Sequence, residues 1–373
     1  MTFEELNISK PILKALENKK LIYPTPIQQK AIPSAINGQD ILGIAQTGTG
    51  KTAAFAIPII EQLNQKGAES KERTIKALIL TPTRELAIQI GECFGDYSRY
   101  TNLRHLVIFG GVKQKAQVDQ LRKGIDILVA TPGRLLDLIN QNYIRLNHIK
   151  HFVLDESDCM LDMGFVHSIR RLLPLLPVQK QTMMFSATMP DTIARLAKTI
   201  LHNPVMVEIQ PSASVVDIID QQLYYVEKPQ KSQLLVSLLQ QELNKSVLVF
   251  SRTKYGADKI ARLLNKKGID CEAIHGNKSQ EARQRTLRNF KSRKTRVIIA
   301  TDIAARGIDI SNLELVINYD LPEVAETYVH RIGRTGRAGN RGTALSFCSS
   351  DERKLVQSIQ KLTGKRIQHV ATI

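Results

Sequence analysis

Short apolar runs alternate with longer stretches of mixed polarity along the chain, and this alternation predicts an α/β protein with buried strands. We expect strands at residues 41–44, 76–80, 106–109, 125–130, 152–154, 182–185 and 205–207, and again at 246–250, 297–300 and 315–317. Apolar positions at helical spacing predict an amphipathic helix over residues 3–20, and a further helix should follow at residues 53–65.

A segment at residues 209–220, which contains Pro, Ser and mixed polar residues, is expected to be a linker. The length of 373 residues suits about two domains, and we place them at residues 1–208 and 221–373. In the second domain the strand at 246–250 leads into Ser251-Arg252-Thr253-Lys254 and a helix, but no Gly-Lys-Thr is present. This layout predicts a duplicated fold whose second copy does not itself bind a nucleotide.

The composition narrows the choice of partner. The chain has 52 Lys and Arg against 35 Asp and Glu, a net charge of +17. Such a surplus favours a polyanion, nucleic acid first, although a generally basic protein is the alternative. The four cysteines lie far apart without metal-site spacing, so we expect reduced thiols in the cytoplasm. We expect no signal peptide, no membrane span and no basic tail.

One stretch has the sequence of a phosphate-binding loop, and its residues are Ala45, Gln46, Thr47, Gly48, Thr49, Gly50, Lys51 and Thr52. An expected strand precedes it and an expected helix follows, which is the context that such a loop requires. The glycines permit a turn that points backbone amides inward, and the helix N-terminus adds free amides. Lys51 would contact the terminal phosphates and Thr52 a magnesium ion. An ordinary glycine-rich turn is the alternative.

Acidic residues follow the expected strand at 152–154, beginning with Asp155 and Glu156. Downstream of a phosphate loop, two carboxylates at a strand end are typical of the magnesium-binding and water-activating pair of an ATPase. Asp155 would hold magnesium through water, and Glu156 would orient the attacking water. A solvated acidic turn is the alternative.

Three other expected strands end in small polar turns, which are 81–84, 110–111 and 131–134. The first and third of these contain Thr and Arg, and the second is Gly-Gly. Because the carboxyl ends of parallel strands share one edge of a sheet, these turns should lie along that edge, where a phosphodiester backbone would suit them. Plain helix caps are the alternative for the two Thr-Arg turns.

The segment from His330 to Arg337 carries arginines at positions 331, 334 and 337. Glycines interrupt it, so it does not suit a solvated helix face. The spacing is typical of arginine fingers, which stabilise charge on a transferring phosphoryl group. A general basic patch is the alternative.

Together these motifs resemble those of the DEAD-box ATP-dependent RNA helicases, within helicase superfamily two. The similarity extends from Phe3 to about Val370 in family order, and the motif wording is most similar to the bacterial RhlE-type branch. The resemblance implies an α/β fold of two tandem RecA-like domains, each with a mainly parallel sheet flanked by helices and joined by a short linker. It also implies an RNA-stimulated ATPase that uses ATP and Mg²⁺ and separates short RNA duplexes as a cytoplasmic monomer.

The resemblance assigns ATP-site roles to single positions. Phe3 resembles the aromatic residue that stacks on adenine, and Gln28 resembles the glutamine that reads the adenine edge. Asp309 resembles the residue that contacts the ribose of ATP. Arg334 and Arg337 match the residues that reach the γ-phosphate.

The resemblance also implies RNA contacts and coupling elements. The positions that match RNA-contacting motifs are Pro82, Thr83, Arg84, Gly110, Gly111, Thr131 and Arg134 in the first domain and Arg252, Gln280, Arg283, Thr301 and Asp302 in the second. The positions that match elements coupling hydrolysis to strand separation are His330, Ser186, Ala187 and Thr188. For the last three, a helix cap is the alternative.

Two positions depart from the family pattern. Ser157 stands where the name-giving tetrad has Ala, but the carboxylates remain, so we expect magnesium binding and hydrolysis to survive. Lys20-Leu21 replaces a Gly-aromatic pair before the proline turn that leads to Gln28, which makes the selectivity for adenine a point to test.

Two alternatives use the same motifs. A processive DNA helicase of the same superfamily is disfavoured by Phe3, Gln28 and the segment at 330–335. An ATP-gated RNA clamp with incidental turnover is disfavoured by Glu156 and the two γ-phosphate arginines.

Overall fold

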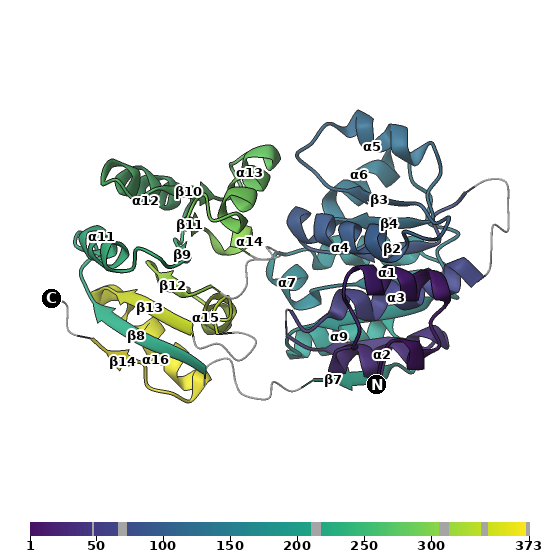
Figure 1. Cartoon of the computed structure of the whole chain (residues 1–373), viewed down its shortest axis with the longest axis horizontal. Coiled ribbons are helices and arrows are strands. Elements are labelled where there is room, and N and C mark those ends of the chain that lie inside the picture. Colours follow the sequence, from purple (N-terminus) through teal and green to yellow (C-terminus); the bar gives the residue numbers. More distant parts are fainter. Residues whose placement is uncertain (47, 66–72, 210–217, 306–312, 337–341, 371–373) are drawn as a thin grey trace. The chain divides into compact units, whose positions relative to one another are not determined.

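The computed structural model describes residues 1–46, 48–65, 73–209, 218–305, 313–336 and 342–370. The chain divides into two compact units, Met1–Gln210 and Pro211–Ile373, each built on a sheet with helices on both faces (Figure 1). Within the described residues each sheet has seven strands, and the strands pair in parallel. The α/β fold with mainly parallel sheets that the sequence predicts is therefore confirmed.

The sheet of the first unit has the strand order β3-β4-β2-β5-β6-β1-β7. Its strands are β1 (Ile41–Ile44), β2 (Ala77–Leu80), β3 (His105–Ile108), β4 (Ile127–Ala130), β5 (His151–Leu154), β6 (Gln181–Ser186) and β7 (Val205–Glu208). Successive side chains point to opposite faces, so Ile79 packs in one core and Leu78 and Leu80 in the other. Because both faces are buried, the central strands are continuous apolar runs, which is why their pattern is visible in the sequence.

Helices cover both faces of this sheet. The helices on the face of Ile79 are η1 (Glu4–Leu6), α1 (Lys10–Asn18), α2 (Pro26–Ile36), α3 (Lys51–Gln65) and α4 (Arg84–Tyr97). Those on the other face are α5 (Gln114–Leu121), α6 (Pro132–Asn140), α7 (Ser157–Asp162), α8 (Val166–Leu172), η2 (Leu173–Leu175) and α9 (Asp191–Ile200). Helix α2 follows a proline turn, and α3 to α7 each follow the carboxyl end of a strand. The first turns of α3 to α7 therefore lie at the edge of the sheet where the strands end.

The sheet of the second unit has the order β10-β11-β9-β12-β13-β8-β14. Its strands are β8 (Ile219–Tyr225), β9 (Val247–Phe250), β10 (Cys271–Ile274), β11 (Val297–Ala300), β12 (Leu315–Asn318), β13 (Gly342–Cys348) and β14 (Gln368–His369). The helices are α11 (Lys231–Gln241), α12 (Lys254–Lys266), α13 (Gln280–Lys291), α14 (Asp302–Ala305), α15 (Ala325–Ile332), η3 (Ser350–Glu352) and α16 (Arg353–Thr363). One face packs against α11 and α12, and the other packs against α13 to α16.

Residues 3–20 do not form the single helix that the sequence predicts. The 3₁₀ turn η1 ends at Asn7, which has a left-handed φ of 56°, and α1 begins only at Lys10. Ser9 is the N-cap of α1, and Pro11 stands in its first turn, where a missing N–H breaks no helical hydrogen bond. Apolar residues at helical spacing therefore occur on both sides of a break between η1 and α1, which is why the sequence pattern predicted one continuous helix.

Four strands of the second unit were missed by the sequence patterns, namely β8, β10, β13 and β14. In β8 and β10 several side chains are half-buried or exposed, among them Asp220, Gln222 and Glu272, so neither strand shows a continuous apolar run. Both residues of β14 are exposed. Elsewhere, all four cysteines are free thiols, and no helix in the described ranges has the length and apolar character to cross a membrane.

Candidate active site

The phosphate loop connects β1 to α3, in the strand-loop-helix order that the sequence predicts. Gly48 and Gly50 have φ angles of 87° and 94°, which glycine adopts without the steric cost of a Cβ. Lys51 is buried at the start of α3, and its Nζ donates to the carbonyl of Ala45 at 2.7 Å. Thr47 lies outside the described residues. The loop thus holds its lysine over the turn in which phosphates would be bound.

Gln28 contacts this loop through its side-chain amide. Its Oε1 accepts from the backbone N–H of Thr25 at 2.9 Å, and its Nε2 donates to the carbonyl of Gly50 at 3.0 Å. An amide has two N–H donors and two acceptor lone pairs, so with respect to the described residues one of each remains, which is the set that an adenine edge requires. A Cβ at position 50 would lie 2.3 Å from the Nε2 of Gln28, so this contact also requires glycine there.

Phe3 is 3% exposed and packs in the core of the first unit. Its backbone N–H donates to the carbonyl of Ile22 at 3.4 Å, which places the N-terminal turn beside the segment that leads to Gln28. Its stacking on adenine stays a prediction, since the ring contributes to the core.

Asp155 and Glu156 follow β5, which lies on the opposite side of β6 from β1. Asp155 is 2% exposed, and this burial raises its pKa to about 7; the charge of Lys51 opposes the rise and Glu156 adds to it. Glu156 has a left-handed backbone, with φ 49° and ψ 51°, which costs a non-glycine residue roughly 1–3 kcal/mol. Such strain is concentrated at sites where a side chain is held for function.

The donor set suits magnesium in one particular way. Among the described residues, no group of three or more His, Cys, Asp and Glu is arranged to hold a metal ion. Mg²⁺ commonly takes one or two protein ligands and completes its shell with phosphate oxygens and water. The buried carboxylate of Asp155, together with the hydroxyl of Thr52 on α3, therefore fits Mg²⁺ that is bound along with a nucleotide.

Asp158 connects α7 to the segment after β6. Its Oδ2 accepts from the backbone N–H groups of Ala187 and Thr188, at 3.1 and 3.0 Å, and from the Thr188 hydroxyl at 3.1 Å. The hydroxyl of Ser186 donates to the Thr188 carbonyl at 2.7 Å. Ala187 and Thr188, two of the residues predicted to couple hydrolysis to strand separation, are therefore bonded to the acidic tetrad at residues 155–158, and Ser186 is connected to it through Thr188. They are not the cap of α9, whose N-cap is Pro190.

Ser157 is fully buried, and its hydroxyl donates to the carbonyl of Phe185 in β6 at 3.1 Å. The hydroxyl at this position therefore has a hydrogen-bond partner and adds no unsatisfied polar group to the interior. It forms an extra bond between the acidic tetrad and β6.

The loops after β3, β4 and β2 are neighbours, because these strands are adjacent in the sheet. The expectation that the three polar turns share one edge is confirmed. The guanidinium of Arg84 lies against the glycine turn, since a Cβ at Gly111 would be 2.2 Å from its Nη1. Arg134 reaches the same turn, where it donates to the carbonyl of Val112 at 3.4 Å and to Gln117 at 3.2 Å.

Two of the remaining predicted residues of these loops, Thr83 and Thr131, stand at helix starts as the N-caps of α4 and α6. Thr83 is the N-cap of α4 and accepts from the N–H of Leu86 at 3.3 Å, so the helix-cap alternative also holds for it. Pro82 and Thr131 are buried, and Gly110 lies beside Gly111.

In the second unit Arg331 is a buried anchor, with 2% of its surface exposed. Its Nε and Nη2 donate to the carboxylate of Asp302 at 2.5 and 2.7 Å. Its Nη1 donates to Asn318 Oδ1 at 3.1 Å and to the Asp320 carbonyl at 2.6 Å. The arginine-finger interpretation therefore does not hold for Arg331. The sequence did contain a signal for the burial of Arg331. Arg331 is three residues after Tyr328, so both side chains lie on the buried side of α15.

The other predicted residues of the second unit are largely buried. Gln280 and Arg283 are 4% and 8% exposed on the first turn of α13, and Thr301 is 8% exposed after β11. His330 and Arg334 line a small pocket together with Asp302 and Arg331. Arg252, which follows β9, is half-exposed and is bonded to Glu352 at 2.7 Å. Asp309 and Arg337 lie outside the described residues.

Two family models match the chain. The one described as DEAD/DEAH box helicase matches residues 25–196, and the one described as helicase conserved C-terminal domain matches residues 230–339.

Curated proteins are similar along nearly the whole chain. The DEAD-box ATP-dependent RNA helicase CshA of Geobacillus kaustophilus (strain HTA426) is 42% identical over 369 residues, which cover 99% of this chain and 78% of that protein. The protein of the same name from Bacillus subtilis (strain 168) is 40% identical over 370 residues, which cover 99% and 74%. These relatives are named CshA, so the RhlE-type branch expected from the motif wording is not supported.

Solved structures are also similar to the chain. S. cerevisiae Dbp5 bound to RNA and ADP BeF3 has a TM-score of 0.85 and 31% identity, covering 99% of this chain and 95% of that one. A DEAD box protein from the hyperthermophile Methanococcus jannaschii has a TM-score of 0.55 and 40% identity, covering 99% of each chain. With the two parallel sheets, this similarity confirms the expected pair of RecA-like domains.

Proposed function

Because the chain belongs to the DEAD-box family of ATP-dependent RNA helicases, we propose that it hydrolyses ATP in response to RNA and separates short RNA duplexes locally, without reading their sequence. One observation carries this proposal most directly. The phosphate loop, the Gln28 amide and the Asp155–Glu156 pair all belong to the first unit, and the charge of Lys51 acts on Asp155. The groups proposed to hold the nucleotide and to activate water thus lie at the same edge of one sheet, after β1 and β5.

In this proposal Gln28 reads the adenine edge and Lys51 holds the terminal phosphates. Glu156 accepts a hydrogen bond from the attacking water and aligns it with the γ-phosphorus. Mg²⁺, held with Thr52 and Asp155, would neutralise charge on the β- and γ-phosphates. The remaining phosphate-loop positions from 45 to 50 bind through backbone amides.

Phe3 and Asp309 complete the nucleotide contacts on the adenine and the ribose. Arg334 and Arg337 supply positive charge to the transferring phosphoryl group, in the manner of arginine fingers. Their part in the reaction is inferred from the motif match in the sequence. His330 and the Ser186 to Thr188 segment couple this chemistry to RNA, which the bonds from that segment to Asp158 support.

RNA is held through its phosphates and 2′-hydroxyls with little readout of bases. In the first unit Arg84 and Arg134 supply the charge, and the glycine turn between them lets the backbone approach closely. The second unit contributes to RNA binding through the loops after β9 and β11 and the first turn of α13. The residues are Arg252, Thr301, Asp302, Gln280 and Arg283. Affinity should therefore fall with salt, with a log–log slope of about −0.7 for each phosphate neutralised on a single strand.

We also propose two domains at residues 1–208 and 221–373 joined by a linker at 209–220; the boundary of the two compact units at Gln210 and Pro211 supports this division, whereas β8 begins at Ile219 and so includes the last two linker positions. A cytoplasmic location is supported by the four free cysteines, since thiols persist in a reducing compartment. The protein is proposed to act as a monomer, and size-exclusion chromatography with light scattering tests this.

The direct test is ATP hydrolysis with and without single-stranded RNA. We expect strong stimulation that is lost in Glu156→Gln, which keeps the shape of the side chain but removes the charge that polarises water. Glu208→Gln is the matched control, because it makes the same change at an exposed strand end. Hydrolysis that ignores RNA, or that persists in Glu156→Gln, would contradict the proposal.

Two further comparisons separate the alternatives. Equal stimulation by a DNA strand of the same sequence would favour a DNA helicase. Strand release without ATP, or ATP-tightened RNA binding without hydrolysis, would favour the RNA clamp.

A further inference from the structure

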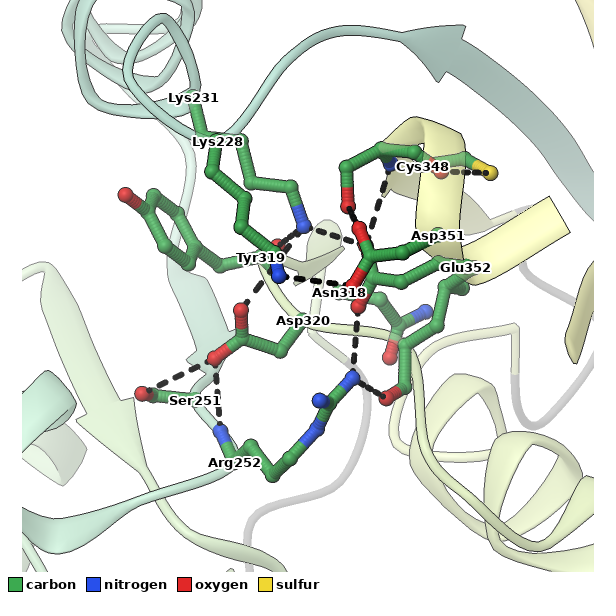
Figure 2. Close-up of polar contacts among 12 residues, drawn as sticks. Lys228, Lys231, Ser251, Arg252, Asn318, Tyr319, Asp320, Cys348, Asp351 and Glu352 are labelled. Atoms are coloured by element: carbon green, nitrogen blue, oxygen red, sulfur yellow. Dashed lines mark hydrogen bonds and ion pairs between the residues drawn. The ribbon is translucent and has the colours of Figure 1, made fainter.

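Four charged residues in the second unit form a cluster that joins segments far apart in the sequence (Figure 2). Lys231 is the first residue of α11, Arg252 follows β9, Asp320 follows β12, and Glu352 immediately precedes α16. The side chains of Lys231 and Glu352 are 2% and 3% exposed, whereas that of Arg252 is 38% exposed. This charge cluster is therefore buried at one end and reaches solvent at the other.

Lys231 is paired inside the unit. Its Nζ donates to Glu352 Oε2 at 2.6 Å and to the carbonyl of Tyr319 at 3.0 Å, and it lies 3.8 Å from Asp320 Oδ1. An ammonium has three N–H donors, of which two are used by the Tyr319 carbonyl and Glu352, while Asp320 adds the charge of a second nearby carboxylate. A lysine buried to this extent is tolerated only when it is paired in this way.

Glu352 binds two cations with its two oxygens. Oε1 accepts from Arg252 Nη2 at 2.7 Å, and Oε2 accepts from Lys231 and from the backbone N–H and hydroxyl of Ser349, at 3.2 and 2.9 Å. Burial acts to raise the pKa of Glu352, but the hydrogen bonds from Lys231 and Ser349 outweigh it and hold the pKa below its ordinary value. The carboxylate is therefore charged at neutral pH.

Arg252 is fixed at both its backbone and its side chain. The backbone N–H donates to Asp320 Oδ2 at 2.9 Å, and Nη2 donates to Glu352 and to the carbonyl of Leu321 at 3.1 Å. The Nε and Nη1 groups take no part in these bonds. The guanidinium is thus held in one orientation on a loop at the carboxyl end of the sheet, and within the part of the chain that the structure describes Nε and Nη1 remain as donors for a ligand.

We propose that Glu352, itself held by Lys231, is a positioning residue that orients Arg252 for contact with an RNA phosphate. This inference rests on the proposed function, in which Arg252 contacts RNA. A guanidinium that is already fixed loses less side-chain entropy when it binds a phosphate. Lys231 compensates the negative charge of Glu352, which reduces its repulsion of the phosphate. Glu352 acts through Arg252 and does not touch RNA.

The test replaces both buried partners at once, Lys231→Met with Glu352→Leu, in the full chain. Removing one partner alone would leave an uncompensated buried charge, whereas apolar replacement of a whole buried pair is often close to neutral for stability. The matched control is Lys228→Met with Asp351→Leu. This neighbouring pair, at 2.7 Å, is exposed, and its removal also leaves the net charge unchanged (Figure 2).

Affinity for a labelled single-stranded oligouridylate is measured by anisotropy, with a non-hydrolysable ATP analogue, over a range of salt concentrations. Arg252→Ala should weaken binding about tenfold, as expected for one charged hydrogen bond, and make the salt slope shallower by about 0.7. The buried-pair variant should weaken binding by about two- to tenfold, the cost of ordering one free side chain. The control pair should bind like the original chain.

A double-mutant cycle shows whether Glu352 acts through Arg252. In an Arg252→Ala background the buried-pair replacement should cause no further loss of RNA affinity. In ATPase assays the buried-pair variant should raise the apparent KM for RNA and leave the KM for ATP unchanged, a split that general destabilisation would not produce.

The outcomes are distinguishable. If Arg252→Ala binds RNA normally, the proposed RNA contact of Arg252 is wrong and the positioning role falls with it. If Arg252→Ala weakens binding but a folded buried-pair variant does not, or if the losses add, only the positioning role is overturned. Should the buried-pair variant fail to fold, Glu352→Gln supports the same cycle, because the glutamine keeps one oxygen as a hydrogen-bond partner for Lys231, beside the charge of Asp320, while its NH₂ group cannot accept from Arg252.

Discussion

Lys20 ends α1 in a left-handed conformation, with φ at 57°. Its N–H donates to the carbonyl of Glu17 at 2.8 Å, and the N–H of Leu21 donates to the carbonyl of Leu16 at 3.0 Å. These two bonds form a Schellman motif with Lys20 in the position where helices prefer glycine. In this conformation the Cβ of an L-residue costs roughly 1–2 kcal/mol. The departure from the family pattern at Lys20 therefore replaces a favoured residue with a strained one.

We predict that Lys20→Gly raises the free energy of unfolding of the first unit by about 0.5–1 kcal/mol. Relief of the left-handed strain contributes about 1–2 kcal/mol, and the greater freedom of glycine in the unfolded chain offsets roughly 0.5–1 kcal/mol of it. Lys20 is exposed, and the two bonds of the motif come from the backbone, so the substitution removes no contact of the core. For a unit of this size the gain corresponds to about 1–4 °C in melting temperature.

Scanning calorimetry measures this gain, and the transition of the first unit is the one that rises with added ADP, since a ligand stabilises the unit that binds it. Asn142→Gly is the matched control. Asn142 has φ at 60° in the Schellman motif that ends α6, and asparagine tolerates this conformation better than lysine. The control should therefore gain less. Loss of stability in Lys20→Gly, or equal gains in stability at positions 20 and 142, would refute the reasoning. In ATPase assays, a changed KM for ATP in Lys20→Gly would show that the residue at position 20 also affects the adenine site.

Three further predictions concern the site. Ser157→Ala removes only the bond to the Phe185 carbonyl, so turnover should change less than about tenfold, or about 1.4 kcal/mol, in steady-state ATPase assays, and a larger change would contradict this. Gln28→Ala should lower the preference for ATP over GTP in a competition assay, because the remaining donor and acceptor of the amide are lost; an unchanged ratio would remove Gln28 from adenine recognition. Gly111→Ala should weaken RNA binding several-fold with little effect on the KM for ATP, since its Cβ would displace the guanidinium of Arg84, and normal RNA affinity would show that this contact is dispensable.

The phosphate loop was predictable because its chemistry restricts the sequence closely. Positive φ angles at positions 48 and 50 favour glycine, and a buried cation at the helix start requires the lysine. The strands β1 and β11 were predicted with their observed bounds, because each has a neighbouring strand on either side and helices over both faces, so that it carries no polar side chain. In each case the residues that determine the local structure are contiguous in the sequence, so the element can be recognised without knowledge of the fold.

The polar contacts that connect the strand-end loops could not be predicted in this way. Asp158 meets Thr188 after 30 residues, Gln28 meets Gly50 after 22, and Glu352 meets Arg252 after 100. Each of these pairings depends on strand order, which no single segment encodes. The burial of Arg331 had a local signal in the spacing of α15, but its partners belong to other loops.

The net charge of the chain can be read from its composition, but the position and burial of each charged side chain depend on the fold. Residues 251–300 hold 14 Lys and Arg against 4 Asp and Glu, so +10 of the net +17 of the chain lies in α12, β10, α13, β11 and their loops. Arg296 in this stretch donates to the carbonyls of Leu239 and Glu242, and Arg283 is 8% exposed, so part of the surplus is structural. Attraction of RNA over distance depends on summed charge, which composition reveals, whereas tight binding depends on donors held in place. At Arg252 the fold holds a guanidinium in place, because Nη2 donates to Glu352 and to the carbonyl of Leu321, and this is the guanidinium that we propose for contact with an RNA phosphate.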